Sequence, residues 1–313
     1  MKAEFKNIAI IGSGVIGAGW IIRLLYNKKK IFVYDPSINQ KKYLISEIKR
    51  TNLFLKKIYK KNYNLNKQLF FCKTIKEAVI NADLIQENTP ENLNIKIKII
   101  KEISTFAKPN SIIASSSSGL LPSKIQSKCL YPERLIIAHP FNPVYLLPLV
   151  ELVGGNKTKK KYIDQARHFY KNIGMHALVL KKELPGYLSD RLQESMWRES
   201  LHIINENYAS TKDLDEAIIY GPGLRWALMG TFLTFHLAGG KMGMAHMLEQ
   251  FGPALKLPWT KLKAPPLTKN LSYKIISGTK KQSKNLSIKK LANLRDNFLI
   301  DLLKLRKKYK IIE

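Results

Sequence analysis

The stretch IAIIGSGVIGAGW, residues 8–20, decides the fold of this 313-residue chain. A short apolar run leads directly into the pattern Gly12-x-Gly14-x-x-Gly17, and the residues that follow open a helix. Strand, glycine turn and helix in this order are what a dinucleotide-binding turn requires. Gly12 permits the tight turn, Gly14 lets the backbone approach a pyrophosphate, and Gly17 lets the helix pack on the strand.

An acidic residue stands where such a turn needs a partner for the ribose. The next β-like run, KIFVYD, ends in Asp35, and this spacing from the glycines is close to the roughly 20 residues typical of the motif. We expect Asp35 to bind the ribose hydroxyls and to repel a 2′-phosphate. No arginine follows it closely, which favours NAD over NADP. The residues expected to contact NAD here are Gly12, Ser13, Gly14, Val15, Ile16, Gly17 and Asp35.

The pattern of predicted secondary structure changes part-way along the chain. In the first, short β-like runs alternate with segments of helical period, which is typical of a doubly wound parallel sheet. One helix there is expected to begin at Pro90, with Thr89 as its N-cap. After the ELPGYL junction, helices broken by Gly and Pro turns replace the strands. We therefore expect an α/β fold, with a Rossmann-like NAD-binding domain at residues 1–184 and an all-helical domain at residues 185–313.

The charge is strongly positive but scattered. Lysine and arginine number 53 against 23 acidic residues, a formal net charge of +30, and their short runs form no single stripe. We expect solvated surface charge and no nucleic-acid partner. No segment approaches the ~20 apolar residues of a membrane span, and no cleavage site precedes the first glycines. We therefore expect a cytoplasmic protein with no membrane partner. Cys72 and Cys129 lack metal-ligand spacing, and we expect no metal.

A second stretch, AHPFNPVYLLPLVELV at residues 138–153, suggests acid–base chemistry. His139 ends an apolar run, prolines follow it, and Glu151 comes twelve residues later. If the chain folds back through the proline-bounded loop, the two side chains meet. Oxidation of an alcohol by hydride transfer needs a base for the hydroxyl proton, and imidazole suits that task near neutral pH. The alternative is a buried histidine satisfied by a structural carboxylate.

These motifs resemble a known group of enzymes. AHPFNPxxxxPLVELV, the preceding ASSSSGL and the glycine turn are similar to the L-3-hydroxyacyl-CoA dehydrogenase superfamily. The resemblance implies a catalytic base, a carboxylate that orients it, and two polar groups near the substrate hydroxyl and the nicotinamide. Its catalytic set is His139, Glu151, Ser118 and Asn142, with Glu91 and Lys96 beside the cofactor.

One departure narrows the resemblance. The superfamily usually has PGFxxNR at the domain junction, whereas this chain has PGYLSDR, which places Asp190 at the asparagine position. The strings GPGLRWALMGTFLTFHLAGG and FGPALKLPWTKL resemble the helical domain of the L-carnitine dehydrogenase family. This favours oxidation of the 3-hydroxyl of L-carnitine, a small-molecule substrate whose quaternary ammonium suits aromatic faces. The candidate substrate residues are Phe141, Asp190, Arg191, Trp197, Arg198 and Trp226.

Other functions stay open at this point. The chain could be an L-3-hydroxyacyl-CoA dehydrogenase or an L-gulonate 3-dehydrogenase, and a third class is a nucleotide-sensing or RNA-binding protein that uses its charge. The acid–base pair of His139 and Glu151 speaks against a protein without catalytic activity, because a sensor needs the glycine turn alone. The resemblance also implies a homodimer formed through the helical domain.

Overall fold

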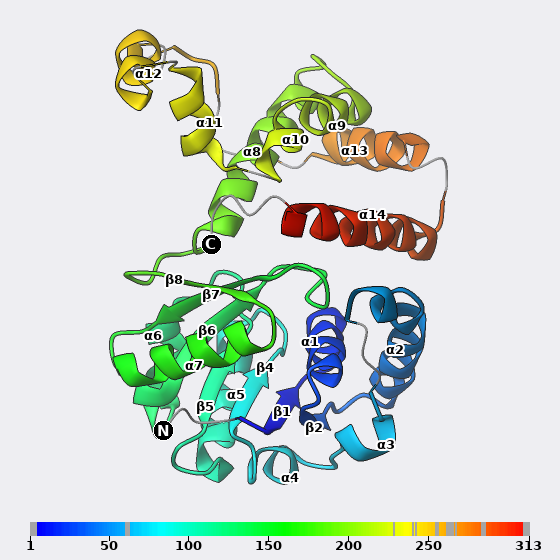
Figure 1. The fold of residues 1–313 in the computed structure, drawn as a ribbon, viewed down its shortest axis with the longest axis vertical. Coiled ribbons are helices and arrows are strands. Elements are labelled where there is room, and N and C mark those ends of the chain that lie inside the picture. The colour runs from blue at the N-terminus through cyan, green and yellow to red at the C-terminus, as the bar shows by residue number, and fades with distance from the viewer. Residues whose placement is uncertain are drawn as a thin grey trace. The chain divides into compact units, whose positions relative to one another are not determined.

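The computed structural model describes residues 5–59, 63–227, 229–239, 241, 243–253, 257–260, 266, 268–282 and 286–308. The chain divides into two compact units, Met1–Arg191 and Leu192–Glu313. In the described residues the first unit is an α/β domain and the second consists of helices and their connections (Figure 1). The predicted fold class, a Rossmann-type domain followed by a helical domain, is confirmed.

The first unit is built on an eight-stranded sheet in the order β3-β2-β1-β4-β5-β6-β7-β8. Its strands are β1 Asn7–Ile11, β2 Lys30–Tyr34, β3 Leu69–Phe71, β4 Leu84–Glu87, β5 Ile112–Ser115, β6 Leu135–Pro140, β7 Leu149–Gly154 and β8 His176–Val179. All neighbours pair in parallel except β6 and β7. The loop at 141–148 is too short for the crossover that a parallel pair requires, so the chain reverses there.

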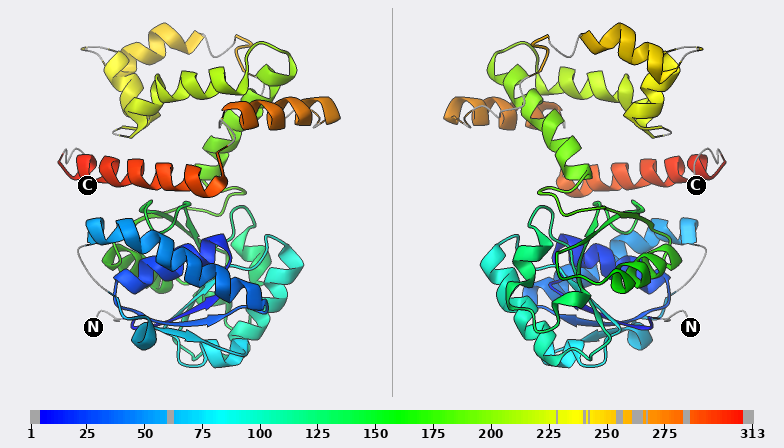
Figure 2. Two further views of the ribbon diagram at one scale, coloured as in Figure 1. Left: turned by 90° about the vertical axis from the view of Figure 1, so that its right-hand side faces the viewer. Right: turned by 90° about the vertical axis from the view of Figure 1, so that its left-hand side faces the viewer.

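Helices cover both faces of this sheet. The first unit contains α1 Val15–Tyr26, α2 Ile38–Tyr59, α3 Leu65–Gln68, α4 Ile75–Val79, α5 Leu93–Phe106, α6 Pro122–Ile125 and α7 Lys160–Asn172, with short 3₁₀ turns at Gln126–Lys128 and Pro132–Arg134. Figure 2 shows α1, α2 and α7 on one side of the sheet and α5 and α6 on the other. Because both faces are covered, the central strands are buried along almost their whole length and are mostly apolar, with polar residues such as Glu87, Ser115 and His139 at or near their carboxyl ends.

The second unit is helical where the structure describes it. Helix α8, Ser189–Asn205, leads into it from the first unit. It is followed by α9 Thr211–Ile219, α10 Pro222–Trp226, α11 Thr231–Ala238, α12 Met244–Phe251, α13 Lys269–Gln282 and α14 Ile288–Lys308. Among the described residues of both units, no helix combines the length and apolar character needed to cross a membrane.

A core on the α4–α5–α6 face sets the sheet edge where ligands bind. Ile11, Ile85, Ile113 and Ile137, one from each of β1, β4, β5 and β6, pack in one buried cluster with Ile100 of α5. This packing aligns the carboxyl ends of four parallel strands. In open α/β sheets, that edge is the usual position of the ligand site.

The start of α5 differs from the prediction. Asn92, not Thr89, is the N-cap, and its side-chain oxygen accepts a hydrogen bond from the Ile95 amide at 3.1 Å. The amide and hydroxyl of Thr89 instead donate to the buried carboxylate of Glu87, at 2.6 and 2.5 Å. The expected N-cap was therefore wrong, because Thr89 donates its hydrogen bonds to the carboxylate two residues before it.

Helix α1 also fixes the loop between β6 and β7. The buried Arg23 side chain donates to the backbone carbonyls of Val144 and Leu147, at 2.7 and 3.1 Å. At Gly19, an added Cβ would lie 2.9 Å from Cβ of Val144. The close approach at Gly19 and the Arg23 hydrogen bonds hold residues 141–148, the loop that follows the candidate base, against the nucleotide-binding helix.

Candidate active site

The glycine turn has the geometry that the sequence predicts. Gly12 adopts φ +90°, in the region that favours glycine, and a Cβ on Gly17 would lie 2.0 Å from the carbonyl oxygen of Gly12. A Cβ on Gly14 would meet nothing within 4 Å. Gly14 is also the N-cap of α1 and has no side chain to cap it. The turn is therefore closed where strand and helix pack, and open where a pyrophosphate would approach the helix N-terminus.

Asp35 lies beside this turn at the end of β2. One carboxylate oxygen accepts from the amide and hydroxyl of Ser13, at 2.7 and 3.1 Å, and the other accepts from the Ser37 amide at 3.0 Å. Asp35 is half-buried, so its carboxylate is held in place while part of it faces solvent. This arrangement, a fixed carboxylate that can accept from ribose hydroxyls next to an open glycine turn, fits an adenosine ribose.

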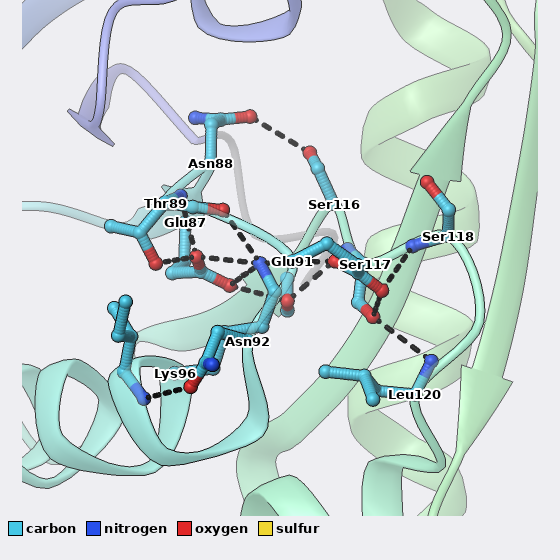
Figure 3. A network of polar contacts seen from close by, with 12 residues as sticks. Glu87, Asn88, Thr89, Glu91, Asn92, Lys96, Ser116, Ser117, Ser118 and Leu120 are labelled. Atoms are coloured by element: carbon cyan, nitrogen blue, oxygen red, sulfur yellow. Dashed lines mark hydrogen bonds and ion pairs between the residues drawn. The ribbon is translucent and has the colours of Figure 1, made fainter. Parts of the chain in front are cut away.

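A buried ion pair lies under the loop between β4 and α5 (Figure 3). The Lys96 ammonium is 1% exposed and contacts Glu87 at 2.9 Å, the Thr89 carbonyl oxygen at 3.0 Å and Glu91 at 3.5 Å. Glu87 is fully buried and also accepts a hydrogen bond from the Ser115 hydroxyl. Lys96 thus fixes this loop through the Thr89 carbonyl and the carboxylates of Glu87 and Glu91. Its contact with the cofactor stays a prediction.

Glu91 joins this loop to the serine-rich segment after β5. Its Oε1 accepts from the Ser117 hydroxyl at 2.5 Å and from the amides of Ser118 and Gly119 at 3.0 and 3.1 Å (Figure 3). The side chain of Ser118 is exposed. Glu91 therefore fixes the backbone of Ser118 and leaves its hydroxyl toward solvent.

His139 and Glu151 meet as the fold-back predicts. They are register partners in the antiparallel pair β6–β7, and Nδ1 of His139 lies 3.0 Å from Oε2 of Glu151. Glu151 is fully buried and also accepts from the Ser189 hydroxyl at 2.6 Å and from the Leu188 and Ser189 amides, each at 3.0 Å. The start of α8 is thus hydrogen-bonded to the carboxylate that holds the histidine.

These hydrogen bonds determine the protonation of the pair. Burial raises the pKa of Glu151, but the hydrogen bonds from His139, Ser189 and Leu188 outweigh it, and the net pKa lies below the ordinary value. An ionised carboxylate only accepts hydrogen bonds, so Nδ1 of His139 carries the proton. In a neutral imidazole, Nε2 is then the lone-pair nitrogen, which a base requires.

The residues around Nε2 come from the domain junction and from the loop after β6. Asp190 Oδ2 lies 3.6 Å from Nε2, and the ring centroids of Phe141 and Tyr187 lie 6.5 and 5.5 Å from that of His139. Sequence reasoning missed Tyr187, which is fully buried at φ +45° and donates to the Leu120 carbonyl at 2.7 Å. Burial raises the pKa of its hydroxyl, which therefore stays a donor. The tyrosine in PGYLSDR, in place of phenylalanine, was the signal available.

The remaining predicted residues lie on exposed or separate parts of the chain. Asn142 is exposed in the loop after β6, and Arg191 is exposed in α8. Trp197, Arg198 and Trp226 belong to the second unit, where Arg198 donates to Glu194 at 3.0 Å. Their roles at a substrate stay predictions. Within the described residues, no group of three His, Cys, Asp or Glu side chains could hold a metal ion.

Comparison with known proteins identifies the family. The model for the 3-hydroxyacyl-CoA dehydrogenase NAD binding domain matches residues 7–184, and the model for the C-terminal domain of that family matches residues 186–284. The chain belongs to the 3-hydroxyacyl-CoA dehydrogenase family. It is therefore an NAD-dependent oxidoreductase, as predicted.

Several family members that are similar to this chain over nearly its whole length are L-carnitine dehydrogenases. The L-carnitine dehydrogenase of Bacillus cereus is 49% identical, covering 98% of this chain and 94% of that protein. The L-carnitine dehydrogenase of Pseudomonas putida is 47% identical, covering 96% and 94%. Among solved structures, an NAD⁺-dependent FHMPC 5-dehydrogenase matches with a TM-score of 0.80 at 24% identity, covering 99% of this chain and 100% of that one. The structural match shows a shared fold.

Two matched glycine substitutions separate packing from cofactor approach. Gly17→Ala should lower the melting temperature, because its methyl group cannot fit 2.0 Å from a backbone oxygen. Gly14→Ala should leave the melting temperature within a few degrees and weaken NAD binding by about tenfold or more, because its methyl group enters the space that the pyrophosphate needs. Thermal unfolding and NAD titration of both variants check this. Equal NAD affinity in Gly14→Ala and wild type would contradict the placement of the pyrophosphate.

Asp35 gives a test of cofactor choice. The wild type should prefer NAD to NADP, and Asp35→Ser should narrow the ratio of their kcat/KM values by about tenfold or more, because repulsion of the 2′-phosphate is removed. Steady-state kinetics with each cofactor measure the ratio. Equal use of both cofactors by the wild type would refute the assignment of Asp35.

Proposed function

We propose that this protein is an NAD-dependent L-carnitine 3-dehydrogenase that oxidises the 3-hydroxyl of L-carnitine to 3-dehydrocarnitine. The observation that carries the chemistry is the buried His139–Glu151 pair at the carboxyl edge of an NAD-binding sheet. The substrate is supported by near full-length similarity to proteins named L-carnitine dehydrogenase.

In this proposal, His139 is the general base. Nε2 accepts the proton of the 3-hydroxyl, and the ionised Glu151 at Nδ1 stabilises the imidazolium that forms. Bound NAD would supply the acceptor for the hydride that leaves C3 of the substrate. Ser118 and Asn142, whose side chains are exposed near the ends of β5 and β6, are proposed to orient the hydroxyl and the carbonyl that replaces it.

The half-buried Phe141 is the proposed aromatic contact for the trimethylammonium. Its ring lies 6.5 Å from that of His139, centroid to centroid, on the loop that Arg23 holds. A quaternary ammonium has no N–H to donate, so aromatic surface is a suitable partner for it. We propose Gly12, Ser13, Gly14, Val15, Ile16, Gly17, Asp35, Glu91 and Lys96 as the cofactor-binding residues.

We also propose that the protein works as a homodimer in the cytoplasm. Within the second unit, α11 exposes large apolar side chains, including Phe232 at 83% and Leu237 at 64%. A second copy packed there would remove them from water.

A substrate comparison tests the proposed function. Purified protein with NAD should oxidise L-carnitine, and NADH formation measured by absorbance gives kcat/KM for each substrate. 3-Hydroxybutyryl-CoA and L-gulonate should have kcat/KM values at least about 100-fold lower, because neither carries the ammonium group. That ratio corresponds to ~2.7 kcal/mol of transition-state discrimination. Turnover of the CoA ester without turnover of L-carnitine would reject the proposal in favour of an acyl-CoA dehydrogenase.

Replacement of Glu151 tests the acid–base pair. In Glu151→Gln, an amide N–H can donate to Nδ1 of His139, which moves the proton to Nε2 and leaves no acceptor for the hydroxyl. We expect kcat to fall by about 10²- to 10⁴-fold, as in His139→Ala, with NAD affinity retained. Ser189→Ala is the matched control. It removes one hydrogen bond to the same carboxylate but no charge, and its effect on kcat should be smaller. Wild-type kcat in Glu151→Gln would make Glu151 a structural residue.

A further inference from the structure

The imidazole of His139 lies between two carboxylates in different surroundings. Glu151 is fully buried at Nδ1, whereas Asp190 approaches Nε2 at 3.6 Å and is 34% exposed. Nε2 is the nitrogen that faces the substrate hydroxyl in the proposed reaction. Asp190 therefore lies on the side of the imidazole where the substrate hydroxyl would bind.

The two carboxylates make different kinds of contact with the ring. Glu151 Oε2 lies 3.0 Å from Nδ1, which is a hydrogen-bond distance, and its other hydrogen bonds fix it to the start of α8. The 3.6 Å between Asp190 and Nε2 is beyond a hydrogen bond but short for a charge interaction. Glu151 thus sets the orientation of the imidazole, while Asp190 sets the charge on its substrate side.

Counting charges shows which substrates this arrangement favours. With both carboxylates ionised, the group of His139, Glu151 and Asp190 is negative overall whether the imidazole is neutral or protonated. A negative site attracts a cationic group and repels an anionic one at short range. An asparagine at position 190 would keep the shape of the side chain and remove one of these charges.

Substrate geometry allows the ammonium to lie beside Asp190. The hydroxyl oxygen must come within roughly 3 Å of Nε2 for proton transfer. In L-carnitine, two carbon atoms separate that oxygen from the ammonium nitrogen, so these two atoms lie about 3–4 Å apart. In a pose in which the ammonium arm points toward Asp190, the carboxylate 3.6 Å from Nε2 comes within short Coulombic range of the ammonium.

We infer that Asp190 is a specificity-determining residue whose carboxylate recognises the quaternary ammonium of the substrate and selects 3-hydroxy acids that carry this group over those with an uncharged group in its place. This inference rests on the proposed function. It differs from a role through His139, in which Asp190 would support the imidazolium and affect every substrate equally. A substrate of the same shape, with an uncharged group in place of the ammonium, separates the two roles.

The experiment compares L-carnitine with 3-hydroxy-5,5-dimethylhexanoate, in which a carbon replaces the ammonium nitrogen. In Asp190→Asn, the ratio of kcat/KM for L-carnitine to kcat/KM for this isostere should fall by about 10- to 100-fold, as expected for loss of one charge at short range. Asp164→Asn is the matched control. It makes the same substitution at an exposed α7 residue paired with Lys160, and the ratio should not change.

A binding measurement gives the same answer without turnover. Competitive inhibition constants for 4-trimethylammoniobutanoate and for 5,5-dimethylhexanoate, which has carbon in place of the ammonium nitrogen, should show the same fall in the preference for the ammonium compound. Thermal unfolding checks that Asp190→Asn is folded. An equal loss of kcat/KM for both substrates would mean that Asp190 acts through His139. An unchanged ratio of the two kcat/KM values would mean that Asp190 does not recognise the ammonium. Either result overturns the inference while L-carnitine turnover by the wild type upholds the proposed function.

Discussion

The carboxylate of Glu151 accepts hydrogen bonds from His139, from the Ser189 hydroxyl and from the Leu188 and Ser189 amides. It is fully buried, and an ionised carboxylate in that position is stable only because all these donors converge on it. One side chain therefore keeps the proton on Nδ1 of His139 and also fixes the backbone at the start of α8. The candidate base cannot be reoriented without breaking contacts of the domain junction.

A second buried carboxylate, that of Glu87, also holds several chain segments together, here the loops on the cofactor side. Glu87 binds Lys96 and the hydroxyls of Thr89 and Ser115, so it joins the ends of β4 and β5 to the first turn of α5. Burial of an ion pair costs desolvation, and it adds to order more reliably than to stability. Here the order is useful, because Glu91 follows Thr89 closely and fixes the amide of Ser118.

The sequence predicted those parts of the site that depend on local pattern. The glycine turn needs only a strand, three glycines and a helix, and the pairing of His139 with Glu151 follows from a proline-bounded loop too short for a crossover. It did not predict contacts made across long sequence separations, such as Ser189 to Glu151 at 38 residues and Ser115 to Glu87 at 28. The N-cap of α5 was misassigned for a different, local reason, because the Glu87 carboxylate two residues earlier accepts the hydrogen bonds of Thr89. A three-residue strand such as β3 is too short to show any period.

The net charge of the protein is positive, but the candidate base lies between two carboxylates. The chain carries a formal net charge of +30, whereas Glu151 and Asp190 lie at the two ring nitrogens of His139. L-carnitine, the proposed substrate, is a zwitterion without net charge, so the positive charge of the whole protein neither attracts nor repels it strongly. Salt also screens charges that are farther away than the Debye length of about 8–10 Å. The two ends of L-carnitine are therefore distinguished only by charges that lie close to one end. Selection for the ammonium must therefore depend on a charge close to it. Asp190 provides such a charge, because its Oδ2 lies 3.6 Å from Nε2 of His139.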